Sequence, residues 1–92
     1  MRTIERASAF KRDYKKVKTI PKHQDIDLVL SSVLSILNAD KTLPKKYRDH
    51  PLYGDFFGYR ECHIKPDLLL IYSKSTGILR LARLGSHSEL FG

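Results

Sequence analysis

The fold is decided by residues 59–84, which read YRECHIKPDLLLIYSKSTGILRLARL. Three runs of strand-forming residues, near 59–64, 68–73 and 78–84, are separated by the turn-forming sequences Lys-Pro-Asp and Lys-Ser-Thr-Gly. Short turns between successive strands predict an antiparallel meander. The middle run, Leu68–Tyr72, is apolar on both faces, so we expect it to be a central strand sandwiched by helices.

The N-terminal half is predicted to be mainly helical. Thr3–Ala7 is short and alternates in character, which is typical of an edge strand. Apolar side chains then recur at helical spacing through residues 10–17 and again through 26–37, and Pro21 separates the two segments. We therefore expect one α+β domain covering residues 1–92. It should contain a small antiparallel sheet of about four strands with two N-terminal helices packed on it.

Two segments outside these elements carry turn and cap signals. Residues 40–58 are rich in Pro, Gly and charge and predict a long ordered loop, and long loops in small domains tend to be functional. The tail Ser86-His87-Ser88-Glu89 has the serine-to-glutamate spacing of a capping box. Ser86 should therefore begin a last helical turn.

The charge balance is strongly positive. Seventeen Lys and Arg residues against ten Asp and Glu residues give a net charge of +7. Residues 1–48 hold twelve of the basic groups and five of the acidic ones, so the N-terminal half supplies the positive field. Such a surface indicates a polyanionic partner such as nucleic acid, although solubility alone also favours net charge.

The sequence also indicates where the protein works. Cys62 is the single cysteine, which excludes an intramolecular disulfide and favours a reducing, cytoplasmic compartment. It is expected to be a small core residue. Charges interrupt residues 1–22 every few positions, so we expect neither a signal peptide nor a membrane anchor.

Titratable side chains are predicted to gather at one end of the sheet. The hairpin turn at residues 65–67 places His63 and Asp67 at the same end. His87 should reach that end when the last strand finishes, and His50 lies on the preceding loop within reach.

This convergence depends on the register of the second hairpin, which turns near residues 75–77. If Lys74 pairs with Ile78, then Leu68 pairs with Leu84. The chain would then leave the sheet beside the first hairpin turn.

Such a cluster suits acid-base cleavage of RNA, in which a base takes the proton of the ribose 2′-hydroxyl and an acid protonates the leaving 5′-oxygen. Imidazole serves in either role because its unperturbed pKa is about 6.5, and no metal or other cofactor is needed. Arg60 or Arg83 is expected to neutralise the developing phosphorane charge. Common zinc-ligand spacings do not occur. For each histidine, a structural role at a turn remains the alternative.

Several motifs of the second half resemble a known family, the YafQ-type toxins of the RelE/ParE superfamily. The motifs that carry the likeness are Leu43-Pro44, YRDHPL at 47–52, Gly58-Tyr59-Arg60, His63, Pro66-Asp67, Leu70-Ile71-Tyr72 and GSHSELFG at 85–92. The likeness covers residues 42–92 motif by motif, whereas the N-terminal half agrees in layout.

The resemblance implies a toxin of a type II toxin-antitoxin module, an endoribonuclease that cuts mRNA in the ribosomal A site. It places the active site at His50, His63, Asp67, His87 and Phe91, with Phe91 stacking or positioning the substrate. We favour His87 as general acid and His50 or His63 with Asp67 on the base side. The expected partners are a cognate antitoxin, in a higher-order hetero-oligomer, and the ribosome with its rRNA and mRNA, but no membrane.

Two rival functions are compatible with the same fold. The gyrase-poisoning, ParE-like branch of the superfamily would have no use for the His and Asp set. A non-catalytic RNA-binding module, held by phosphate contacts, is the second rival.

Overall fold

The computed structural model describes residues 2–92 as one five-stranded sheet with helices on both faces. The order of elements is β1 (Thr3–Arg6), α1 (Ser8–Lys18), η1 (Pro21–His23), α2 (Ile26–Asn38), η2 (Lys45–Tyr47), β2 (His50–Pro51), η3 (Gly54–Phe56), β3 (Arg60–Lys65), β4 (Leu68–Ser75), β5 (Ile78–Gly85) and α3 (His87–Phe91). The predicted α+β class is confirmed, and the loop predicted at residues 40–58 contains η2, β2 and η3.

The strands lie in the order β1-β5-β4-β3-β2. The meander of β3, β4 and β5 is antiparallel as predicted, but β1 runs parallel to β5 and β2 adds a fifth strand beside β3. The sheet is therefore mixed, where about four antiparallel strands were expected. β2 has only two residues, too few to show strand alternation, and the pairing of β1 with β5 joins residues more than 70 positions apart.

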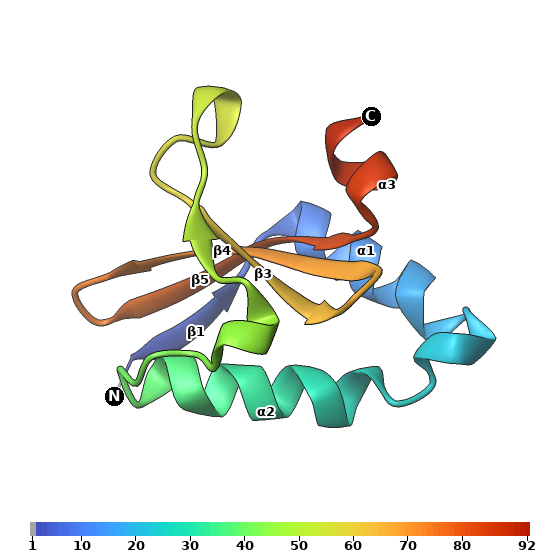
Figure 1. The fold of residues 1–92 in the computed structure, drawn as a ribbon, viewed down its shortest axis with the longest axis horizontal. Coiled ribbons are helices and arrows are strands. Elements are labelled where there is room, and N and C mark those ends of the chain that lie inside the picture. The colour runs from blue at the N-terminus through green and yellow to red at the C-terminus, as the bar shows by residue number, and fades with distance from the viewer. Residues whose placement is uncertain (1) are drawn as a thin grey trace.

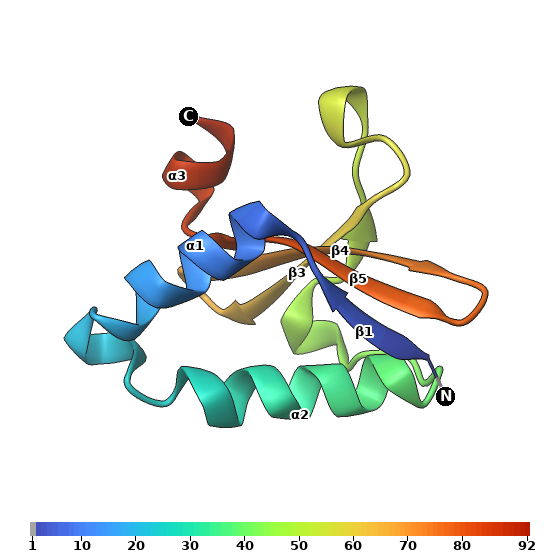
Figure 2. The same ribbon diagram turned by 180° about the vertical axis from the view of Figure 1, so that it is seen from behind.

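β4 is the central strand, and its two faces support different layers. Leu68, Leu70 and Tyr72 belong to the main core with side chains of α1 and α2, and α2 lies below the sheet in Figure 1. Leu69 and Ile71 point to the upper face, where only α3 and the 50–58 segment cover them. These two segments rise as separate projections in Figures 1 and 2. Helices thus sandwich β4 unequally, and the upper face is partly open.

The register of the second hairpin differs from the prediction. Lys74 pairs with Leu79 and not with Ile78, and a bulge at Ala82 shifts the pairing by one more residue. The sequence could not predict this bulge, because one extra residue hardly changes the alternation of apolar and polar side chains in so short a strand. The chain nevertheless leaves the sheet at Gly85, at the same end as the β3–β4 turn.

The capping box at the start of α3 is confirmed. Ser86 Oγ accepts a hydrogen bond from the Glu89 backbone N–H at 3.2 Å, and the Glu89 carboxylate accepts one from the Ser86 N–H at 3.0 Å. The reciprocal bonds fix the direction in which α3 leaves the sheet. Within residues 2–92, no helix is long and apolar enough to cross a membrane.

Candidate functional site

Glu61 lies at the centre of the candidate site because of strand alternation along β3. Cys62 and Ile64 point into the main core, so Glu61 and His63 point to the upper face. The pairing of β2 with β3 places His50 directly opposite Glu61. Three titratable side chains from two adjacent strands thereby meet on one surface.

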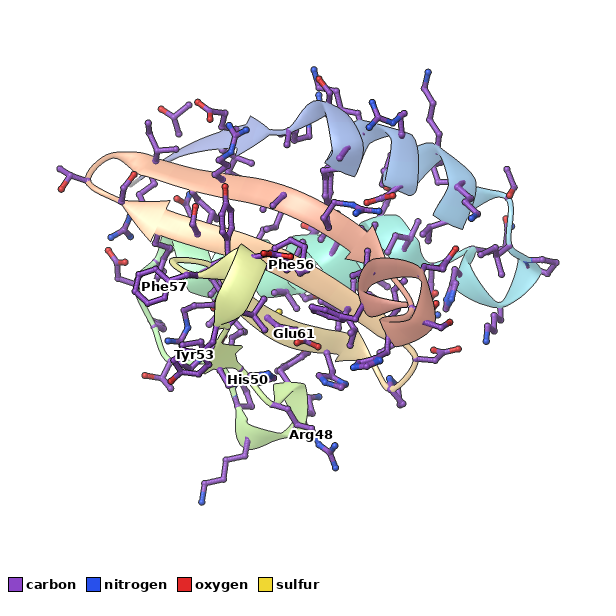
Figure 3. All side chains as sticks on the ribbon, turned by 90° about the horizontal axis from the view of Figure 1, so that it is seen from above. Arg48, His50, Tyr53, Phe56, Phe57 and Glu61 are labelled. Atoms are coloured by element: carbon purple, nitrogen blue, oxygen red, sulfur yellow. The ribbon has the colours of Figure 1, made fainter. Side chains whose placement is uncertain are left out.

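The Glu61 carboxylate lies between the two imidazole rings. Its Oε2 is 3.4 Å from His50 Nε2, and its Oε1 is 3.7 Å from His63 Nε2. The Glu61 side chain is only 6% exposed, whereas His50 is 47% and His63 22% exposed. Figure 3 shows His50 beside Glu61 when the sheet is viewed from above. A carboxylate shielded from water at these distances stabilises positive charge on either ring.

The backbone before β2 orients the His50 ring. Arg48 adopts the left-handed conformation with φ of 49°, ending η2. Its carbonyl oxygen lies 2.7 Å from His50 Nδ1 and, since a carbonyl only accepts, Nδ1 carries the proton of this hydrogen bond. The bond leaves Nε2 directed at Glu61, which is the geometry of an oriented acid-base group.

His87 stands on α3 at the edge of the same face. Its ring centroid is 5.1 Å from that of Phe91, and Phe91 meets Phe56 of η3 edge to face at 5.6 Å. In the sheet, Gly85 pairs with Leu69, which pairs with His63. His63 and the start of α3 are thus separated by two strand spacings, or roughly 10 Å.

Asp67 does not join the histidines in the way that the sequence predicted. Its carboxylate accepts a hydrogen bond from Lys22, and this contact lowers the pKa of Asp67 below its ordinary value. The side chain lines a small hollow of about 180 Å³ together with His23, Ser86 and Glu89. Among the described residues the ion pair of Asp67 is with Lys22, whereas Glu61 is the carboxylate beside both rings, and a part for Asp67 in catalysis stays a prediction.

The two arginines proposed to neutralise phosphate charge are both engaged by carboxylates. Arg60 donates to Asp49 at 3.1–3.3 Å, and Arg83 donates to Asp13 at 2.7 and 3.2 Å. These hydrogen bonds raise the pKa of both guanidinium groups. Tyr72 Oη also donates to Asp49 at 2.5 Å. Both arginines therefore hold the fold together here, which the sequence analysis did not foresee.

A groove of about 690 Å³ extends from His63 toward α2. It runs between the β3 edge, η2 and α2, with apolar walls and basic side chains at its rim. The residues that line it are Leu28, Val29, Ser32, Lys46, Tyr47, Arg48, His63, Ile64, Lys65 and Pro66. A polyanion entering it would meet one of the candidate catalytic rings.

Cys62 is confirmed as a core residue. It is fully buried, and burial raises the pKa of its thiol to about 12, so the group is neutral at physiological pH. Across residues 2–92, no three His, Cys, Asp or Glu side chains are close enough together to hold one metal ion.

Glu61 is the site residue that sequence reasoning missed. The available signal was its position two residues before His63, because residues i and i+2 of a strand share a face. That signal was weak without β2, whose pairing brings His50 to the other side of the carboxylate.

Comparison with known protein families shows the class of proteins to which this chain belongs. Residues 2–92 match a family described as bacterial toxins of type II toxin-antitoxin systems, YafQ. The class is therefore that of the toxin component of such systems.

Individual relatives agree along the whole chain. The mRNA interferase toxin YafQ of Escherichia coli K12 is 36% identical over 91 residues, covering 99% of this chain and 97% of its own. The crystal structure of YafQ from E. coli BL21(DE3) superposes with a TM-score of 0.87 at 35% identity, covering both chains completely. A metal-bound toxin from Helicobacter pylori has a TM-score of 0.83 at 43% identity, covering 99% of this chain and all of its own. This chain belongs to the YafQ toxin family.

Proposed function

We propose that this protein is an endoribonuclease that cleaves mRNA on the ribosome by metal-independent acid-base chemistry. The observation that carries the proposal is the Glu61 carboxylate, nearly buried between the His50 and His63 rings on the partly open face of the sheet. A relative 36% identical over almost the whole chain is named an mRNA interferase. The gyrase-poisoning alternative offers no task for this arrangement.

The base side of the reaction fits His50 or His63. A ring that takes the proton of the 2′-hydroxyl becomes an imidazolium, and Glu61 stabilises that charge as it forms. This assignment gives Glu61 the role first expected of Asp67. Asp67 keeps a place at the end of the sheet, where its contact with Lys22 helps to fix the β3–β4 turn against η1.

The acid side fits His87. It is exposed on α3, which follows β5, and one strand, β4, lies between β5 and the strand that carries His63. A protonated imidazole there would deliver its proton to the leaving 5′-oxygen. Phe91, in contact with the His87 ring, would hold a base adjacent to the scissile bond by stacking.

The basic groups supply the binding energy for a polyanion. The net charge of +7 and the Lys46 and Arg48 side chains at the rim of the His63 groove favour phosphate contacts with rRNA or mRNA. Arg60 and Arg83 act indirectly, because their carboxylate partners already occupy them. Binding should therefore weaken steeply as salt concentration rises.

We further propose that a cognate antitoxin binds this chain in a hetero-oligomeric complex. The solved E. coli DinJ–YafQ complex contains a chain with a TM-score of 0.86 and 38% identity to this one, covering both chains completely. An acidic segment that orders on binding would match the positive surface.

Substitution of His87 by Gln tests the nuclease proposal. In a cell-free translation reaction, the wild-type protein should cut the messenger, and the variant should lose cleavage by about three orders of magnitude or more. The ribosome affinity of the variant should change little, because the seventeen Lys and Arg side chains make most of the phosphate contacts. His23→Gln, the same change at a buried histidine of η1 that has no role in the proposed reaction, serves as the control and should cleave normally once its folded fraction is matched.

Full cleavage by His87→Gln would refute the assignment of the acid. An intact messenger with wild-type protein, together with trapped gyrase-DNA complexes, would support the rival toxin activity instead. Binding without cleavage by wild-type protein would support the non-catalytic module.

A further inference from the structure

A finger of residues 52–59 carries two aromatic rings that nothing in the proposed reaction uses. The Tyr53 and Phe57 side chains are 74% and 77% exposed, among the most exposed large hydrophobic residues of the described chain. The finger rises from the sheet as the yellow-green projection at the top of Figure 1. Figure 3 shows both rings at its outer side, away from the covered part of the sheet. Rings held in water in this way mark a contact surface.

The finger is held in a fixed shape. The Leu52 N–H donates to the Tyr59 carbonyl at 2.9 Å, which closes its base. Phe56 packs on Phe91 at 5.6 Å and edge to face on Tyr59 at 6.4 Å, so the middle of the finger is anchored to α3 and to its own stem. Because the finger is already ordered, a ligand that stacks on it loses little conformational entropy.

The finger also joins the two halves of the candidate site. His50 on β2 immediately precedes its stem, and Phe56 contacts Phe91, one helical turn after His87. A single strand of RNA with its scissile phosphate between His63 and His87 therefore has its neighbouring nucleotides within reach of the finger. Arg48 lies close to His50, at the base of the finger, in Figure 3.

We infer that Tyr53 and Phe57 form a stacking subsite for unpaired nucleobases flanking the cleaved bond, a role that rests on the proposed RNA cleavage. Aromatic faces accept any base, so the subsite would bind without strong sequence preference. Asp55, the one carboxylate of the finger, repels phosphates and so directs bases rather than the RNA backbone to the tip. If the finger bound a protein instead, its two rings would be buried against apolar side chains of the partner, and the charge of Asp55 would not orient the partner.

The test measures binding of a short single-stranded 2′-O-methyl RNA oligonucleotide, which lacks the nucleophile and is not cut. Tyr53→Ala and Phe57→Ala should each weaken binding by about 5- to 150-fold, the range of one base-aromatic stack. Tyr53→Phe keeps the ring and should bind within about twofold of the wild type. Ile4→Ala, which shortens a hydrophobic residue 42% exposed on β1, at the opposite edge of the sheet from β2, is the matched control and should bind normally.

Salt dependence separates stacking from charge. The alanine variants should lose affinity equally at all salt concentrations, because removal of a ring releases no counterions. Wild-type affinity for the oligonucleotide in both Ala variants would overturn the inference, and so would absence of binding by the wild-type protein. Loss of antitoxin binding with unchanged oligonucleotide binding would identify a protein-docking surface and also overturn it.

The two proposals fail in distinguishable ways. If the wild-type protein binds the oligonucleotide through the finger but cuts no messenger, the subsite stands and the nuclease proposal fails. If it cuts the messenger while both Ala variants bind like wild type, the nuclease proposal stands and the subsite fails.

Discussion

Replacement of Glu61 by Gln removes the charge between His50 and His63 with almost no change in shape. If either ring is the general base, Glu61 stabilises the imidazolium that forms in the transition state from 3.4 or 3.7 Å away. At 3.4 Å, Coulomb's law gives about 1 kcal/mol at the dielectric constant of water and about 5 kcal/mol at an effective value of 20. His50 is half exposed, so screening favours the lower part of this range, about 1–2 kcal/mol. The expected loss in kcat/KM is therefore about 5- to 30-fold.

The assay is single-turnover cleavage of messenger on programmed ribosomes, with the folded fraction checked by thermal melting. Glu5→Gln is the matched control, because it removes a carboxylate from β1 at the opposite edge of the sheet. It should cleave at the wild-type rate. A Glu61→Gln variant that is folded and cleaves within about twofold of wild type would refute a charge-stabilising role for Glu61.

Three further outcomes follow from the structure. Hydrogen bonds from Lys16 and from the Ser86 N–H lower the pKa of Glu89 from 4.5 to about 2. The ionised carboxylate therefore stabilises the fold fully at pH values above 4.5, and this contribution is lost as the pH falls toward 2. Urea unfolding should show wild type more stable than Glu89→Gln at pH 5 and nearly equal to it at the acid end, and a constant difference would contradict this. Asp13→Ala should lower the free energy of unfolding by about 2 kcal/mol, since it strands the Arg83 charge and the Leu84 N–H, and a urea-measured loss below about 0.5 kcal/mol would exclude that role. Toxin that has been dialysed against EDTA and then added to untreated ribosomes should cleave messenger within about twofold of the rate before dialysis. A large loss of cleavage that one added metal restores would refute metal-independent chemistry.

Local sequence signals predicted the elements that depend on near neighbours in the chain. The doubly apolar run Leu68–Tyr72 had to be a central strand, because both of its faces need cover. The apolar spacing of α2 and the capping box at Ser86 likewise act within one or two helical turns. The sequence therefore also predicted the end of the sheet near which His63, Asp67 and His87 lie, while their part in catalysis stays a prediction.

Contacts between distant segments were decided only by the tertiary structure. Lys22 and Asp67 are 45 residues apart in the sequence, and Asp13 and Arg83 are 70 apart. Local sequence patterns therefore could not predict that these ion pairs form. The bulge in β5 and the two-residue strand β2 have no periodicity of their own. Their pairing sets the register, and a shift of one residue moves a side chain to the other face of the sheet. The sequence by itself determined which titratable side chains the chain offers, and the pairing of β2 with β3 in the folded sheet determined that Glu61, and not Asp67, lies between the two rings.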